Sequence, residues 1–177
     1  GLSDECDIPW SPFIQLNEGS WDPTTPTNNI WGTYYKAIRA SFKFENNVGR
    51  CTELANDLKT RYTGEAIFLR GYYYFMLIRQ YGPVVLLKEE MPSSSGFGDM
   101  QRSPFDECID YVVECMDKAY EMLPYSYQSD KTNRGRATKV ICNAVKAQAL
   151  LLAASPQWNG NSEYYSLLRD KDGNPLV

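Results

Sequence analysis

The chain has 177 residues, of which 43% are hydrophobic and 23% charged, a composition typical of a globular protein. Acidic residues outnumber basic ones, 22 to 18, and the net charge of −4 without a basic cluster argues against a nucleic-acid partner. The sequence contains no run of about 18 apolar residues, so no segment of it is typical of a membrane span. It contains no histidine, which excludes His-based catalysis and His metal ligation within these residues.

The five cysteines lack the CxxC spacing of a zinc site. Cys108 and Cys115 lie seven residues apart on one predicted helix, which separates their Cα atoms by about 10.5 Å, too far for a disulfide. We interpret the cysteines as small core residues and leave open a disulfide between other pairs. The sequence predicts neither a metal site nor a cofactor.

The first elements are an irregular loop and two helices. Residues 1–27 are predicted as loop because proline and glycine interrupt them repeatedly. Apolar residues then recur at helical spacing and predict a helix over 28–47, capped by Thr27 or Asn28. The same period predicts one long helix over 50–81, bent near Gly64 and ended by Gly82-Pro83. A short extended run at 84–87 and a loop follow.

The second half predicts two further long helices. In the first of these, over 103–123, Ser103 is the expected cap, Pro104 the first helical residue and Asp106 the partner in a capping box. The next helix, over 138–154, is expected to be capped by Thr138. A short fifth helix is expected over 162–169. The closing sequence, DKDGNPLV, has the chemistry of a hairpin turn.

Six aromatic rings lie in the stretch GEAIFLRGYYYFMLIRQYG, residues 64–82. On a helical wheel the apolar side chains occupy two sides of this helix instead of one stripe. We therefore expect the helix to lie between two layers of helices, with its tyrosine hydroxyls bonded to polar partners such as Arg70 and Glu65. The predicted fold class is all-α, with tetratricopeptide-like helix pairs and long irregular loops.

Four blocks of the chain resemble the SusD/RagB-type nutrient-binding lipoproteins in sequence and in order. They are NNIWGTYYKAIRASFKFENNV, GEAIFLRGYYYFMLIRQYGPVVLL, SPFDECIDYVVECMDKAYEMLP and GRATKVICNAVKAQALLLAASPQWNG. The short sequence LSDE near the start resembles a T/S-D-E element of the same family. Together these elements are spread along nearly the whole chain, from residue 2 to residue 160.

The resemblance implies an all-α protein on the outer face of the outer membrane of Bacteroidota-like bacteria. Such proteins bind glycans, or sometimes peptides, and deliver them to a SusC-like TonB-dependent transporter. They are held by a lipidated N-terminal cysteine. Cys6 lacks a lipobox and is not that cysteine, so we expect an N-terminal-half fragment whose lipid anchor and C-terminal ligand face lie outside this chain.

Sugar binding combines an aromatic ring face with hydrogen bonds from polar side chains. The resemblance implies ligand contacts from the loop after the T/S-D-E element, which here holds Trp10, with Asp7 beside it. Trp21 and Phe97 are further candidates, although Trp10 and Trp21 could instead pin the loop to the helices, the reading favoured for Trp21. We expect Trp158 to pack against a helix end. Arg136 is expected to pair with a carboxylate, the alternative being an anion site formed with Arg134.

Three functions remain open from the sequence. The first is a non-enzymatic surface component that captures glycans, and the second is a tetratricopeptide-type scaffold that binds a peptide or partner protein. A groove lined by Asn, Lys and Arg without exposed Trp would favour the scaffold. A glycoside hydrolase is the third and least supported, because the pairs Glu89-Glu90 and Asp106-Glu107 are adjacent in sequence and point apart.

Overall fold

The computed structural model describes residues 18–20, 22, 29–92, 96, 98–128 and 130–177. The chain divides into two compact units, Gly1–Thr33 and Tyr34–Val177. In the first unit, the Asn29 side chain accepts a hydrogen bond from the Trp31 backbone at 3.1 Å, where the first described helix begins. The expected caps Thr27 and Asn28, and most of the predicted loop over 1–27, lie outside the described residues.

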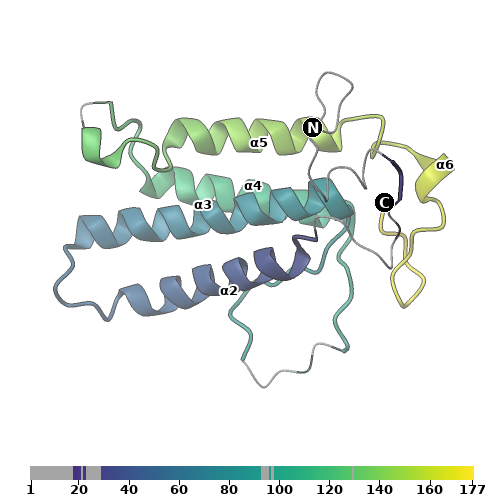
Figure 1. Cartoon of the computed structure of the whole chain (residues 1–177), viewed down its shortest axis with the longest axis horizontal. Helices are drawn as coiled ribbons and strands as arrows, with labels where there is room; N and C mark the ends of the chain where they lie inside the picture. The colour runs from purple at the N-terminus through teal and green to yellow at the C-terminus, as the bar shows by residue number, and fades with distance from the viewer. Residues whose placement is uncertain (1–17, 21, 23–28, 93–95, 97, 129) are drawn as a thin grey trace. The chain divides into compact units, whose positions relative to one another are not determined.

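The described part of the chain is helical (Figure 1). Its elements are α2 (Trp31–Val48), α3 (Asn56–Tyr81), α4 (Phe105–Met122), the 3-10 turn η1 (Lys131–Asn133), α5 (Lys139–Ala153) and α6 (Ser162–Tyr165). Among the described residues, extended pairing consists of a bridge between Arg169 and Pro175 and a bridge position at Asp22. The predicted all-α class is confirmed. None of the helices described is both long and apolar enough to cross a membrane.

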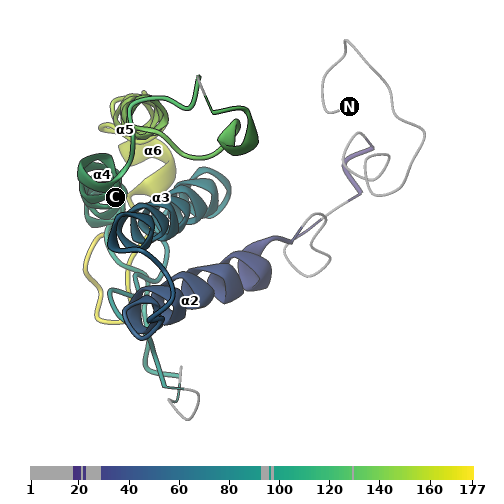
Figure 2. The ribbon, with the colours of Figure 1, turned by 90° about the vertical axis from the view of Figure 1, so that its left-hand side faces the viewer.

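Helix α3 lies in the middle of the second unit, as its two apolar sides predict (Figure 2). On one side its Tyr73 ring stacks on Tyr34 of α2 with centroids 5.4 Å apart. On the other side Tyr74 meets Tyr111 of α4 edge to face at 5.3 Å. Tyr74, Leu77 and Ile78 are fully buried. Tyr74 and its apolar neighbours are therefore core, whereas Tyr73 is half-buried and Tyr72 is 36% exposed.

The partners of the buried polar groups differ from the prediction. The Tyr74 hydroxyl accepts a hydrogen bond from the Leu87 backbone N–H at 2.8 Å and lies 3.2 Å from the Leu87 carbonyl. Arg70, which we expected near the tyrosines, instead pairs with Glu45 of α2 at 2.7 Å. The extended run after α3 passes along the tyrosines. Its backbone groups therefore provide the hydrogen-bond partners of the tyrosine hydroxyls that we expected from charged side chains.

The start of α3 is a correction to the predicted helix over 50–81. The helix begins at Asn56, with Ala55 in an extended conformation and without a side-chain cap. Residues 50 and 51 belong to the turn that closes α2, because their N–H groups donate to the carbonyls of Asn47 and Val48. The chain must reverse direction between two antiparallel helices, and this reversal uses the residues that continue the apolar period.

The start of α4 is a second correction. Pro104, and not Ser103, occupies the position before the helix, and no side chain caps it. The Ser103 N–H donates to the Val84 carbonyl at 2.8 Å, and the Phe105 N–H donates to the Leu176 carbonyl at 2.8 Å. Tertiary backbone hydrogen bonds thus replace the predicted capping box.

The remaining boundaries follow the sequence more closely. Thr138 caps α5 as predicted, and its hydroxyl accepts from the Ile141 N–H. Helix α6 is capped by Asn161 and ends at Tyr165, four residues before the predicted end at 169. The closing turn is held by Asp170, whose Oδ1 accepts from the N–H groups of Asp172 and Asn174 at 2.9 and 2.8 Å.

Three of the four described cysteines lie in the core. Cys108, Cys115 and Cys142 are buried and free, as small core residues would be. Cys51 is free as well, but it is exposed, so the core interpretation is wrong for this residue. Cys6 lies outside the described residues.

Candidate ligand-binding site

The sequence-predicted ligand residues Asp7, Trp10, Trp21 and Phe97 all lie outside the described residues. Their role remains a prediction, and the structure does not show which of them come together. The described residues contribute a different feature, a group of aromatic rings around Trp158.

Trp158 is held between two other rings. Its indole stacks on Phe105, the first residue of α4, with centroids 4.3 Å apart and planes inclined by 13°. Its other face stacks on Tyr165, the last residue of α6, at 4.6 Å and 5°. Trp158 is 7% exposed. The prediction that it packs against a helix end is confirmed, and both of its ring faces are occupied by protein.

The local backbone explains how Trp158 reaches this place. Helix α5 ends at Ala153, and the next turn is closed by the Trp158 and Asn159 N–H groups, which both donate to the Ser155 carbonyl. The indole then lies against Gly82, just after α3. A Cβ atom at Gly82 would come within 2.6 Å of the Trp158 ring, and Gly82 also has a φ of +71°. Only glycine can adopt this positive φ and also leave room for the indole ring without strain.

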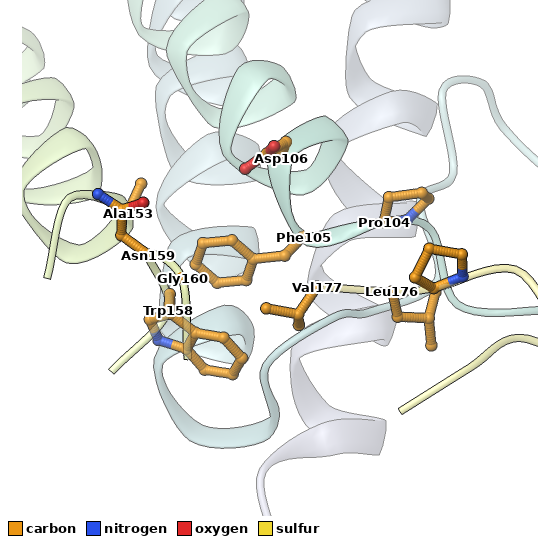
Figure 3. Close-up of a pocket in the computed structure, with 10 residues that line it drawn as sticks. Pro104, Phe105, Asp106, Ala153, Trp158, Asn159, Gly160, Leu176 and Val177 are labelled. Carbon is orange, nitrogen blue, oxygen red and sulfur yellow. The ribbon is translucent and has the colours of Figure 1, made fainter. Parts of the chain in front are cut away.

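A first cavity of about 320 Å³ opens beside the Phe105–Trp158 pair (Figure 3). Its lining residues are Pro104, Phe105, Asp106, Ala153, Trp158, Asn159, Gly160, Pro175, Leu176 and Val177. Asp106 and Asn159 supply the polar side-chain oxygens and nitrogen of this lining. The Trp158 indole N–H is buried and has no acceptor in the described part of the chain.

A second cavity, of about 500 Å³, lies at the C-terminal end of α3, and we name it the Arg79–Arg102 cleft. It is lined by Arg79, Gln80, Tyr81, Gly82, Pro83, Arg102, Gln157, Trp158, Tyr164, Tyr165, Leu167 and Leu168. Trp158 lines both cavities. The sequence interpretation missed this cleft, although Arg79 stands three residues before Gly82-Pro83, where a helix ends, and Arg102 stands directly before Ser103-Pro104, where a helix begins.

Arg136 is not available as an anion site. Its Nε donates to Glu65 Oε1 at 2.7 Å, and its Nη2 contacts the other carboxylate oxygen. The guanidinium lies 4.9 Å from the centre of the Tyr62 ring. The neighbouring Arg134 donates to the Gln128 carbonyl at 3.4 Å. The predicted carboxylate pairing is confirmed, and it ties the loop before α5 to α3.

The titratable groups of the core are structural and not reactive. Burial raises the pKa of the Tyr35 hydroxyl, which donates to the Val85 carbonyl at 2.7 Å. Burial likewise raises the pKa of Cys108 to about 11. These groups stay neutral. Tyr35 fixes the extended run at 84–87 against α2, and the Cys108 thiol, 3.6 Å from the Val84 carbonyl, fixes it against α4. Across the described ranges, no three Cys, Asp or Glu side chains gather as a metal site would require.

Comparison with known proteins gives the family. A family profile described as "Starch-binding associating with outer membrane" (SusD-like) matches residues 10–151 of this chain. The chain belongs to the SusD-like family. A solved SusD-like protein from Bacteroides fragilis NCTC 9343 is 33% identical with a TM-score of 0.69, and the match covers 80% of this chain and 27% of that chain.

Two further structural matches support the fold. A laminarin-binding SusD-like protein is 19% identical with a TM-score of 0.70, over 82% of this chain and 31% of that one. Surface glycan-binding protein A from Bacteroides uniformis is 18% identical with a TM-score of 0.67, over 80% and 31%. The chain spans 27 to 31% of the length of these three solved proteins. Among proteins with curated annotation, none matches this chain.

Proposed function

We propose that this chain is part of a cell-surface protein that binds oligosaccharides and delivers them to a SusC-like TonB-dependent transporter. The observation that carries the proposal is membership of the SusD-like family over residues 10–151. The laminarin-binding relative supports it, because a protein of the same fold binds a glucan. The proposed location is the outer face of the outer membrane, with a lipid anchor outside this chain.

The proposed ligand contacts are Trp10 first, then Asp7, Trp21 and Phe97. An indole offers a flat apolar face to a sugar ring, while a carboxylate accepts hydrogen bonds from its hydroxyls.

We propose capture without cleavage. Glycoside hydrolysis requires two carboxyl groups on either side of the scissile bond, about 5 to 9.5 Å apart. In the cavity of Figure 3, Asp106 is the single carboxylate among the described lining residues, and the Arg79–Arg102 cleft has none among those described. This distribution supports a binding role.

The scaffold alternative lacks a supporting observation. A groove of about 390 Å³ between α2 and α3 is lined by Ala37, Ala40, Ser41, Phe44, Tyr62, Glu65, Ala66, Leu69, Tyr73 and Arg136. Its described lining contains no Asn or Lys, and its Arg136 is paired with Glu65. It therefore does not present the polar groove that a tetratricopeptide-type peptide site would need.

Calorimetric titration of the intact protein against a polysaccharide panel tests this proposal. We expect at least one glycan to bind, and Trp10→Ala to abolish the signal without a change in melting temperature. Tyr125→Ala is the matched control, because Tyr125 is a loop aromatic that is 70% exposed. If the wild-type protein binds no glycan, the proposal is wrong.

A further inference from the structure

We propose that the Arg79–Arg102 cleft binds the acid group of a charged sugar, either the carboxylate of a uronic acid or a sulfate ester. This inference rests on the proposed glycan-binding function and specifies its ligand class. The shared chemistry is an oxyanion carried on a sugar ring.

The first argument is the charge of the cleft. Arg79 and Arg102 are the two charged residues among its described lining, and both are cations. The chain as a whole carries a net charge of −4. A purely basic lining in an acidic protein concentrates positive potential at one place and attracts an anion there.

The second argument is the state of Arg79. It lies in the last turn of α3 and is exposed, with its guanidinium 5.7 Å from the Phe75 ring centre. No carboxylate among the described residues pairs with it, in contrast to Arg70 and Arg136. Its only described polar contact is a 3.9 Å approach to the Met76 sulfur. A guanidinium binds carboxylates and sulfates through two parallel N–H donors, and Arg79 retains donors for this purpose.

The third argument is that the second guanidinium comes from a different segment. Arg102 precedes α4, and its Nη1 lies 3.4 Å from the Tyr81 carbonyl, which places it beside the end of α3. Two arginines from separate elements therefore border one hollow. This arrangement would hold an oxyanion between the end of α3 and the segment that precedes α4.

The fourth argument is the aromatic and amide lining, which suits the sugar ring itself. Tyr164 on α6 is 74% exposed at this cleft and offers a ring face, while Tyr81 is half-buried. Gln80 and Gln157 add amides to the lining. A volume of about 500 Å³ lies within the range of small-molecule sites, roughly 300 to 1,000 Å³.

The test uses titration calorimetry of the intact protein with four probes. They are an oligogalacturonate, its methyl ester, a sulfated carrageenan oligosaccharide and a neutral laminari-oligosaccharide. We expect an acidic probe to bind and the methyl ester, which keeps the sugar backbone but loses the charge, to bind at least about tenfold more weakly. Comparing the uronate with the sulfated probe identifies which acid group is held.

Variants assign the binding to the cleft. Arg79→Gln and Arg102→Gln should each weaken the acidic probe about tenfold or more. Arg79→Lys keeps the charge at the helix end but loses the paired donors, so it should also weaken binding. Arg134→Gln, an exposed arginine outside the cleft, is the control and should bind as the wild type does. Unchanged melting temperatures show that each variant is folded.

The failures of the two proposals differ. If neutral glycans bind and acidic ones do not, or if the arginine variants bind the acidic probe normally, this inference is overturned while glycan capture stands. If neither the four probes nor any polysaccharide of the panel binds, both the glycan-capture proposal and this inference are wrong.

Discussion

Gly71 decides how closely α3 and α4 approach each other. A Cβ atom at this position would lie 2.7 Å from the Cys115 Cβ and 2.5 Å from the Met116 Cε. The methionine could move, but the Cys115 Cβ is fixed to the backbone of α4. A larger residue at 71 would therefore push the two helices apart.

Gly71→Ala should destabilise the protein by about 1 to 3 kcal/mol, the usual cost of overpacking a core. Gly32→Ala is the matched control, because Gly32 is also helical and has nothing within 4 Å of the added Cβ. The control should be neutral or slightly stabilising, since alanine is the better helix former. Urea unfolding measures both, and equal stabilities for the two variants would refute the packing argument.

The buried arginine of α3 depends on one carboxylate. The Arg70 side chain is 6% exposed, pairs with Glu45 at 2.7 Å and lies 4.0 Å from the centre of the Phe42 ring. Removing the charge of Glu45 leaves a cation in the core without its counter-ion, which is costly. The 34% exposure of Glu45 lets water offset part of this cost.

Glu45→Gln should therefore lower the free energy of unfolding by about 1 to 3 kcal/mol. Glu114→Gln breaks the exposed pair with Lys118 and should change it by less than about 0.5 kcal/mol. Denaturant titration of both variants provides the comparison. A loss no larger at Glu45 than at Glu114 would show that the burial of Arg70 has no energetic consequence.

The cysteines should differ sharply in reactivity. Burial raises the pKa of Cys108 and Cys142 to about 11 and also raises that of Cys115, so few thiolates form near neutral pH. Cys51 is exposed. Alkylation of the folded protein at pH 8, followed by peptide mass spectrometry, should label Cys51 and spare the other three until denaturant is added. Rapid labelling of Cys108 in the folded state would contradict the packed core.

The burial of Tyr74 and the pairing of Arg136 were predictable from the sequence, but the groups that they bond to were not. Helical periodicity placed Tyr74 in the core, whereas its bonding to the Leu87 backbone depends on where the extended run passes. The pairing of Arg136 with a carboxylate was predicted, yet Glu65 lies 71 residues away and was named only as a tyrosine partner. Long-range pairing is set by tertiary packing, which local pattern does not encode.

At the scale of elements, the helices were predictable and their starts were less so. Helix α5 begins as predicted because Thr138 caps it locally. Helix α4 begins at Phe105 because the Leu176 carbonyl, far along the chain, accepts its N–H. A capping box is a local sequence signal. A tertiary backbone hydrogen bond can replace it, and no local sequence pattern predicts such a bond.

The η1 turn should loosen in acid. Asp130 accepts hydrogen bonds from the Thr132 hydroxyl at 2.7 Å and from the Asn133 side chain at 2.5 Å, which lower its pKa from 3.8 to about 2. Because this pKa is depressed in the folded state, the stabilisation is present above about pH 4 and is lost as the pH falls through about 2. An NMR titration of the Asp130 carboxyl should give a midpoint near 2. A midpoint at 3.8 or above would contradict these hydrogen bonds.

For the whole molecule, the family was predictable from the sequence and the Arg79–Arg102 cleft was not. Four sequence blocks carry the SusD-like resemblance, and the family match over residues 10–151 confirms it. The Arg79–Arg102 cleft is formed by residues from the end of α3, the start of α4 and the region of α6. The cleft forms only where these three segments meet around Trp158, so no single stretch of the sequence predicts it.

We propose that this SusD-like protein captures glycans without cleaving them. The most direct measurement is to bind the intact protein to a polysaccharide, incubate the complex, and analyse the recovered glycan by size-resolved chromatography. We predict that the polysaccharide is retained by the protein and recovered at its original chain length. Failure to retain any polysaccharide, or recovery of shortened chains, would contradict the claim.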